Sequence, residues 1–241
     1  MSNLATSHKN PQSIHMIQRG LIAGFPIILG YLPVAVTFGV LAKQSGMSMT
    51  ELTLMSLFVY AGASQFMGAN MIAVGVGSIE IIVATFVLNF RHFVMSLSFM
   101  NRLREVGLKF RLPLSLLLTD ETFAMSSIHQ KKVKDDKGVL FYLTILVSAY
   151  LSWIIGTILG GFLGDIIPEK LSQSMGIALY AMFIGLLIPS VKKELKVGLI
   201  AIIAMLINMM CSQFMNDGWA IVMGTVFGGL SGVYFFKEQQ S

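Results

Sequence analysis

The chain has 241 residues, of which 55% are hydrophobic and only 12% are charged. Soluble domains carry about 25% charged residues, so this composition excludes an ordinary soluble protein and indicates an integral membrane protein. Apolar runs of about 18 or more residues predict spanning helices, whereas a barrel would alternate over segments of about ten residues. The net charge of +5 lies in short loops, so it relates to membrane orientation and not to nucleic acid.

The N-terminal residues 1–18 are polar, and we expect a loose tail there, followed by a single transmembrane domain over 19–241. The first apolar run covers 21–42 and contains Pro26 and Pro33. Their spacing places both prolines on one face of a helix. Each proline removes a backbone donor and leaves a carbonyl free to bind something else.

The second apolar run, 52–76, carries Ser64 and Gln65 among small residues. Small residues let helix backbones approach closely in a membrane. Gln65 brings a hydrogen-bond donor and an acceptor into the hydrocarbon. It serves either a binding site or an interhelical hydrogen bond, and the sequence leaves both interpretations open.

The third run, 79–100, has Asn89, Arg91 and His92 near its centre. A charge there costs about 2.5–3.5 kcal/mol, so these groups need partners or water. At about 100° per residue the polar residues form two opposite faces. One face holds Thr85, Asn89, His92 and Ser96, and the other holds Glu80, Arg91 and Ser98. We therefore expect a central helix; the alternative is that Arg91 extends its charge to the interface.

The fourth segment, 113–128, begins at Pro113 and is interrupted by Thr119-Asp120-Glu121-Thr122. It is short for a span, and adjacent acids inside an apolar segment are typical of a broken or re-entrant helix that lines a cavity. Basic loops, 102–111 and 131–137, flank it on both sides. The alternative is an amphipathic loop outside the membrane.

Four plainer runs complete the chain, at 139–163, 171–189, 197–215 and 219–236. We therefore predict an all-α polytopic membrane protein with seven or eight apolar segments, at least one of them broken or re-entrant. The run at 139–163 and the last run carry glycines at a spacing of four, which predicts close helix packing. One glycine row could serve an internal contact and the other a partner subunit.

Two weaker patterns concern symmetry and orientation. Ser64-Gln-Phe-Met67 recurs as Ser212-Gln-Phe-Met215, which is compatible with an internal repeat of the kind found in secondary transporters. Lys192, Lys193 and Lys196 mark one loop as cytoplasmic. We therefore expect a multi-pass protein of the cell (inner) membrane whose C-terminus is cytoplasmic.

Five motifs occur in a specific order between about Gly20 and the C-terminus. They are Gly24-Phe-Pro-Ile, Pro33-Val-Ala with Phe38-Gly39, Ala63-Ser-Gln-Phe66, Asn89-Phe-Arg-His92 and Thr119-Asp-Glu-Thr122. As a set they resemble the AzlC/YgaZ family, the large subunit of branched-chain amino acid exporters. The resemblance implies export of valine, leucine, isoleucine and methionine. It also implies a small, separately encoded membrane partner of the AzlD/YgaH type.

The charged residues suit an amino-acid zwitterion bound by a secondary transporter. Arg91 can hold a carboxylate through two parallel hydrogen bonds, and Asp120 or Glu121 can meet the ammonium. The expected substrate-binding residues are Ser64, Gln65, Asn89, Arg91, His92, Asp120, Glu121 and Thr122. Proton coupling is expected from Asp120, Glu121 and His92, which are titratable groups at membrane depth.

Other interpretations compete with this one. Arg91 can pair with Asp120 or Glu121 without any substrate, and the chain can be a passive amino-acid channel or a scaffold that is active only with its partner. An intramembrane enzyme is disfavoured because no H-E-x-x-H or comparable ligand spacing occurs. We therefore expect no enzymatic activity, no metal and no cofactor.

Overall fold

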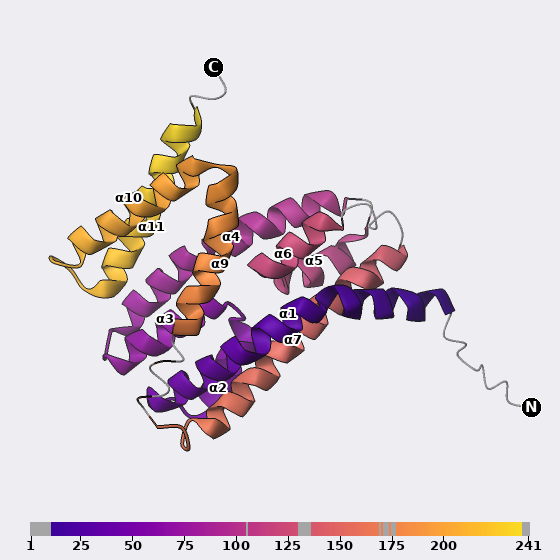
Figure 1. Cartoon of the computed structure of the whole chain (residues 1–241), viewed down its shortest axis with the longest axis horizontal. Coiled ribbons are helices and arrows are strands. Elements are labelled where there is room, and N and C mark those ends of the chain that lie inside the picture. The colour runs from indigo at the N-terminus through magenta and orange to yellow at the C-terminus, as the bar shows by residue number, and fades with distance from the viewer. Residues whose placement is uncertain are drawn as a thin grey trace, which may run out of the picture. The chain divides into compact units, whose positions relative to one another are not determined.

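The computed structural model describes residues 11–104, 106–129, 136–168, 170, 174 and 177–237, and every regular element in these ranges is an α-helix. The basic residues Lys131, Lys132 and Lys134 and the first ten residues fall outside the described ranges. The helices, labelled in Figure 1, are α1 (Pro11–Gln44), α2 (Met49–Phe58), α3 (Gly62–Ala73), α4 (Ser78–Arg102), α5 (Leu108–Leu116), α6 (Asp120–Ile128), α7 (Asp136–Leu163), α9 (Ile177–Lys193), α10 (Leu195–Cys211) and α11 (Asp217–Lys237).

Four of the described helices are long and apolar enough to cross a membrane. They are Ile14–Gln44, Ser78–Arg102, Gly138–Leu163 and Gly218–Phe235. Helix α10 and the half-helix α2 are apolar but shorter. The all-α membrane class is therefore confirmed for the described residues, whereas the number of seven or eight segments stays a prediction. Helix α1 already begins at Pro11, inside the segment expected to be a tail.

The chain divides into two compact units. The first unit comprises Met1–Pro33 and Arg91–Ile155, and the second comprises Val34–Phe90 and Gly156–Ser241. Helices α1, α4 and α7 run from one unit into the other, so each of the three contributes residues to both.

In the first unit, α1 packs on α7 through small residues. A Cβ atom added at Gly20 would lie 2.8 Å from the Phe141 carbonyl oxygen, which leaves no room for any other residue there. Tyr142, buried at 2% exposure, packs its ring edge-on against Phe99 at 6.0 Å and donates a hydrogen bond to the His129 carbonyl at 2.9 Å. These contacts connect α7 to α4 and to the end of α6.

In the second unit, both predicted glycine rows contact helices of this same chain. A Cβ at Gly160 of α7 would lie 2.1 Å from the Val36 carbonyl oxygen, and one at Gly228 of α11 would lie 2.4 Å from Ala204 of α10. Helices α10 and α11 form the hairpin seen in Figure 1. Neither row is therefore reserved for a partner subunit. Within the hairpin, Lys196 donates a hydrogen bond to the Phe235 carbonyl. The start of α10 and the end of α11 therefore lie side by side.

Two apolar segments are broken, one as predicted and one not. The fourth segment consists of α5 and α6, separated at 117–119. The second apolar run, predicted as one helix, also breaks, between α2 and α3. Tyr60 lies in this break with φ at +41°, a left-handed conformation that is strained for a tyrosine. The apolar pattern of the sequence gives no sign of such a break.

One further expectation, the internal repeat, stays a prediction, and another, the enclosure of α4, is wrong. Ser64–Met67 lies in helix α3, whereas Ser212–Met215 follows the end of α10 in a turn, so the two copies of the tetrapeptide differ in secondary structure and give the repeat no support. Helix α4 is not enclosed on all sides, because an apolar stripe along it is exposed. The stripe comprises Ile79, Ile82, Phe86, Phe90, Phe93 and Leu97. A helix has room for an apolar face between two narrow polar ones, and an exposed apolar face suits lipid.

Candidate functional site

The first unit contains a polar cluster at the start of α6. Thr119 caps this helix through a reciprocal pair of hydrogen bonds with Thr122, from the Thr119 amide to the Thr122 hydroxyl at 2.8 Å and from the Thr122 amide to the Thr119 hydroxyl at 3.4 Å. Both threonines are buried. The cap satisfies backbone donors that the helix leaves open. It also fixes the two acids that follow Thr119 in the first turn, where the helix dipole favours negative charge.

Arg91 of α4 forms an ion pair with Asp120 of α6. Nη1 of Arg91 lies 2.9 Å from Oδ2 of Asp120, and the side chains are 36% and 26% exposed. The prediction that Arg91 pairs with one of the two acids is therefore confirmed. The pair connects helices that are separated along the sequence by a basic loop. Since both side chains retain some exposure, the pair remains accessible to a competing ligand.

Tyr31 of α1 completes the cluster, although it is not among the residues predicted for the site. Its hydroxyl lies 2.5 Å from Oε2 of Glu121 and 2.6 Å from Oγ1 of Thr119. A tyrosine has one hydroxyl hydrogen, so Tyr31 donates to the carboxylate and accepts from Thr119. Its ring packs edge-on against Trp153, with centroids 5.3 Å apart. The signal was present, because Tyr31 is the one polar side chain between the two prolines of α1.

The two adjacent acids therefore have different partners. Asp120 meets a guanidinium, whereas Glu121 meets a neutral hydroxyl. Among the described residues, the ion pairs are Arg91–Asp120 and the peripheral Lys43–Asp165. The charge of Glu121 is thus not balanced by a direct lysine or arginine contact within the described part of the chain.

Two buried nitrogen atoms next to the ion pair have no hydrogen-bond partner among the described residues. They are Nε of Arg91 and Nε2 of His92. Buried polar atoms are nearly always satisfied in folded proteins, by protein groups, by water or by a ligand. The two orphaned nitrogens are therefore where a polar ligand or water would gain hydrogen bonds.

The remaining predicted residues lie in a separate network in the second unit. Gln65 donates to the Ser56 hydroxyl at 2.8 Å, and that hydroxyl lies 2.8 Å from the Thr157 hydroxyl. All three side chains are fully buried. Ser64 donates to Oδ1 of Asn89 at 2.5 Å. Gln65 therefore makes an interhelical hydrogen bond, which is one of the two roles that the sequence left open for it. This hydrogen bond connects α3 to α2 across the break at Tyr60.

The predicted residues thus form one group around Arg91, Asp120, Glu121 and Thr122 in the first unit and another around Ser64, Gln65 and Asn89 in the second. Their convergence on one pocket stays a prediction. The described residues contain no group of three or more histidine, cysteine, aspartate or glutamate side chains that could hold a metal.

Comparison with known proteins gives a consistent result. The family model described as AzlC protein matches residues 26–167, more than half of the chain. The chain is 35% identical to an uncharacterized membrane protein of Archaeoglobus fulgidus, over 73% of this chain and 77% of that protein. It is 26% identical to the branched-chain amino acid transport protein AzlC of Bacillus subtilis, over 83% and 80%. It is 30% identical to the inner membrane protein YgaZ of Escherichia coli, over 70% and 71%. None of the solved structures matches the chain significantly.

Proposed function

Because this chain belongs to the AzlC protein family of membrane transport proteins, we propose that it is a secondary transporter that exports branched-chain amino acids. Its substrates would be valine, leucine, isoleucine and methionine, and its location the cell (inner) membrane with a cytoplasmic C-terminus. The observation that carries this proposal is the Arg91–Asp120 ion pair with the orphaned nitrogens of Arg91 and His92 beside it.

The cluster offers what a zwitterion needs. A substrate carboxylate can replace Asp120 on Arg91 and take up the free Nε, since a guanidinium binds carboxylates through two parallel hydrogen bonds. The substrate ammonium can then meet the released Asp120 or the unbalanced Glu121. Substrate binding would exchange one ion pair for two, so the Arg91–Asp120 contact acts as a gate that the substrate opens.

We assign proton coupling to Glu121 rather than to Asp120. Glu121 is held by Tyr31 as a hydrogen-bond acceptor, so its ionised form fits the present arrangement. A protonated Glu121 becomes a donor, and Tyr31, Thr119 and Glu121 would have to exchange donor and acceptor roles. Uptake of a proton would therefore change the contact between α1 and α6. Antiport requires such a coupling between protonation and the arrangement of the helices.

We assign Ser64, Gln65 and Asn89 to the support of the broken helix α2–α3, since their hydrogen bonds are made within the protein. A small membrane subunit of the AzlD/YgaH type is the expected partner. A passive channel is less well supported, because a pore usually presents rings of like groups and not a closed ion pair.

The test is counterflow of radiolabelled leucine into proteoliposomes, with and without the small subunit. We expect saturable uptake that trans leucine accelerates, with losses of about tenfold or more for Arg91→Gln, as removal of one charge-assisted hydrogen-bonding group predicts. The matched control is Arg104→Gln. Arg104 is an exposed arginine in the turn that follows α4, and this variant should transport leucine normally. Uptake that neither saturates nor accelerates would indicate a channel, and activity only with the small subunit would indicate a scaffold.

A further inference from the structure

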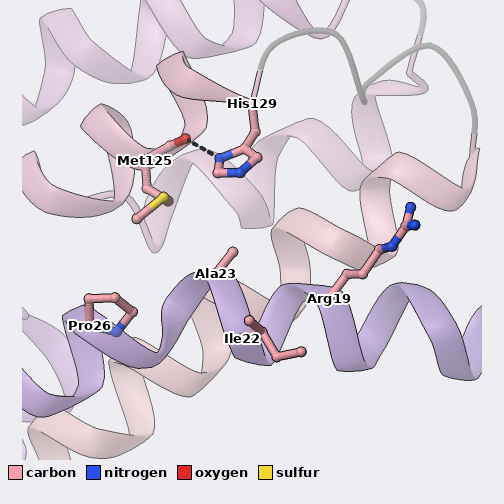
Figure 2. Close-up of a pocket in the computed structure, with 6 residues that line it drawn as sticks. All are labelled: Arg19, Ile22, Ala23, Pro26, Met125 and His129. Carbon is pink, nitrogen blue, oxygen red and sulfur yellow. Dashed lines mark hydrogen bonds between the residues drawn. The ribbon is translucent and has the colours of Figure 1, made fainter.

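A hollow of about 600 Å³ lies between α1 and α6 in the first unit. It is lined by Arg19, Ile22, Ala23 and Pro26 of α1 and by Met125 and His129 of the α6 end. Figure 2 shows Ala23 pointing from α1 toward Met125 and His129, with Arg19 and Pro26 at opposite ends of the α1 wall. The volume is within the range of about 300–1,000 Å³ that is usual for small-molecule sites.

The hollow is lined by the same two helices that carry Tyr31, Thr119 and Glu121. Tyr31 contacts Thr119 and Glu121 at the start of α6, whereas Pro26 and Arg19 lie earlier in α1, opposite the later residues Met125 and His129. The two helices are therefore antiparallel. At about 1.5 Å per residue, Pro26 is about 7.5 Å from Tyr31 along α1. A ligand in the hollow would lie one to two helical turns from Glu121.

The lining has the three features that a hydrophobic amino acid requires. Arg19 supplies a cation for the carboxylate. Pro26 has no backbone N–H, so the carbonyl of Ile22 one turn earlier loses its usual helical partner and can accept from an ammonium. Ile22, Ala23 and Met125 supply an apolar surface. The His129 Nδ1 binds the Met125 carbonyl at 3.1 Å, which leaves Nε2 as the ring nitrogen available to a ligand.

The hollow lies at the basic end of this unit. Arg102, at the end of α4, places its guanidinium 4.7 Å from the centre of the Phe123 ring and binds the Ser127 hydroxyl at 2.6 Å. Arg104 follows Arg102 in the loop, and Lys109 and Arg111 lie in the first turn of α5. Loops rich in lysine and arginine are retained in the cytoplasm. This charge pattern therefore favours a cytoplasmic location for the end of α6 that borders the hollow.

We propose that this hollow is the cytoplasmic mouth of the transport path, where the zwitterion of a hydrophobic amino acid binds before it reaches Arg91. The proposal rests on the function proposed above and adds a second binding position to it. Arg19 attracts the carboxylate, and the carbonyl of Ile22 orients the ammonium. An anionic phospholipid offers a similar combination of acid and aliphatic chain, so the experiment must separate the two ligands.

The experiment uses the full chain, in which Cys211 is the only cysteine. In a Cys211→Ala background, Ala23→Cys is reacted with a membrane-impermeant maleimide in inverted and in right-side-out vesicles. We expect labelling in inverted vesicles. Leucine at ten times its half-protecting concentration should slow labelling about tenfold, as single-site occupancy requires. Gln18→Cys, exposed one turn earlier and outside the hollow, is the matched control and should be labelled without protection.

Two further variants keep the test decisive. Met125→Cys probes the opposite wall if Ala23→Cys does not fold. Arg19→Gln added to either cysteine variant should raise the half-protecting leucine concentration about tenfold, as loss of a charge-assisted contact predicts.

Three outcomes would overturn the proposal: no protection by saturating leucine, labelling only from the right-side-out face, or protection by anionic lipid alone in liposomes of defined composition. If leucine counterflow persists in such a case, the transport function stands and only the mouth is misplaced. If counterflow is absent as well, both proposals fail.

Discussion

The hydroxyl of Tyr31 lies 2.5 Å from the carboxylate of Glu121, while the neighbouring Asp120 pairs with Arg91. Two adjacent acids thus meet two chemically different partners. Because a guanidinium carries charge and a phenol does not, the two carboxylates should respond differently to substitution. This difference would distinguish the proposed gate at Asp120 from the proposed proton-coupling group Glu121.

The first prediction concerns the Tyr31–Glu121 hydrogen bond. Tyr31→Phe removes the donor but keeps the ring on Trp153. The substitution removes the hydrogen bond through which a change at Glu121 would reach α1, so we expect leucine efflux to depend less steeply on the pH gradient. The measurement is efflux from loaded vesicles over a pH series. Tyr234→Phe, at an exposed tyrosine of α11, should leave the profile unchanged, and an unchanged profile in Tyr31→Phe would contradict the assignment of Glu121.

The second prediction concerns the Arg91–Asp120 pair. Asp120→Asn leaves Arg91 without its counter-ion, whereas Arg91→Gln with Asp120→Asn removes both charges. We expect the double variant to be more stable in detergent than Asp120→Asn alone, because an unpaired, partly buried charge costs more than its absence. A double-mutant cycle in thermal unfolding measures the coupling.

The control for that cycle is the exposed pair Lys43–Asp165, whose atoms are 3.8 Å apart and whose aspartate is 72% exposed. Exposed pairs contribute about 0–1 kcal/mol, so Asp165→Asn should change stability little. Equal effects at the two aspartates would mean that Arg91 does not depend on Asp120.

The third prediction concerns the close contact of α1 and α7 in the second unit. A Cβ at Gly39 would lie 2.2 Å from the Thr157 carbonyl oxygen, and a backbone atom cannot move aside as a flexible side chain can. Gly39→Ala should therefore destabilise the protein by about 1–3 kcal/mol, as overpacking does. Gly30→Ala, in the same helix with nothing within 4 Å, should be neutral or stabilising. Thermal unfolding of both variants makes the comparison.

The fourth prediction concerns the buried network that connects α2, α3 and α7. Thr157→Val keeps the shape of the side chain but deprives the Ser56 hydroxyl of one partner. Such a loss costs about 1–3 kcal/mol when the remaining group is buried. Thr85→Val is the matched control, because Thr85 bonds only to carbonyls of its own helix. Equal unfolding temperatures for the two variants would show that the network does not stabilise the break at Tyr60.

Most residues of the candidate site are predictable from the sequence, whereas their arrangement is not. The cost of charge in hydrocarbon predicted that Arg91 needs a counter-ion and that Asp120 or Glu121 would supply it. This cost did not predict which of the two acids would pair with Arg91. Both acids lie in the first turn of α6, and the choice depends on the side chain that faces each of them. Tyr31 stands out in the sequence as a polar side chain between two prolines, but the sequence does not show which group its hydroxyl will face.

By itself, the sequence determined the membrane class, the helical character, the broken segment at Asp120 and the family. These follow from composition, from the length of apolar runs and from motifs, all of which are properties of neighbouring residues. Only the tertiary structure decided the strained break at Tyr60, the internal use of both glycine rows and the exposed stripe of α4. Those features depend on which helices pass within a few ångströms of each other, and long-range packing of that kind is not encoded in any one stretch of chain.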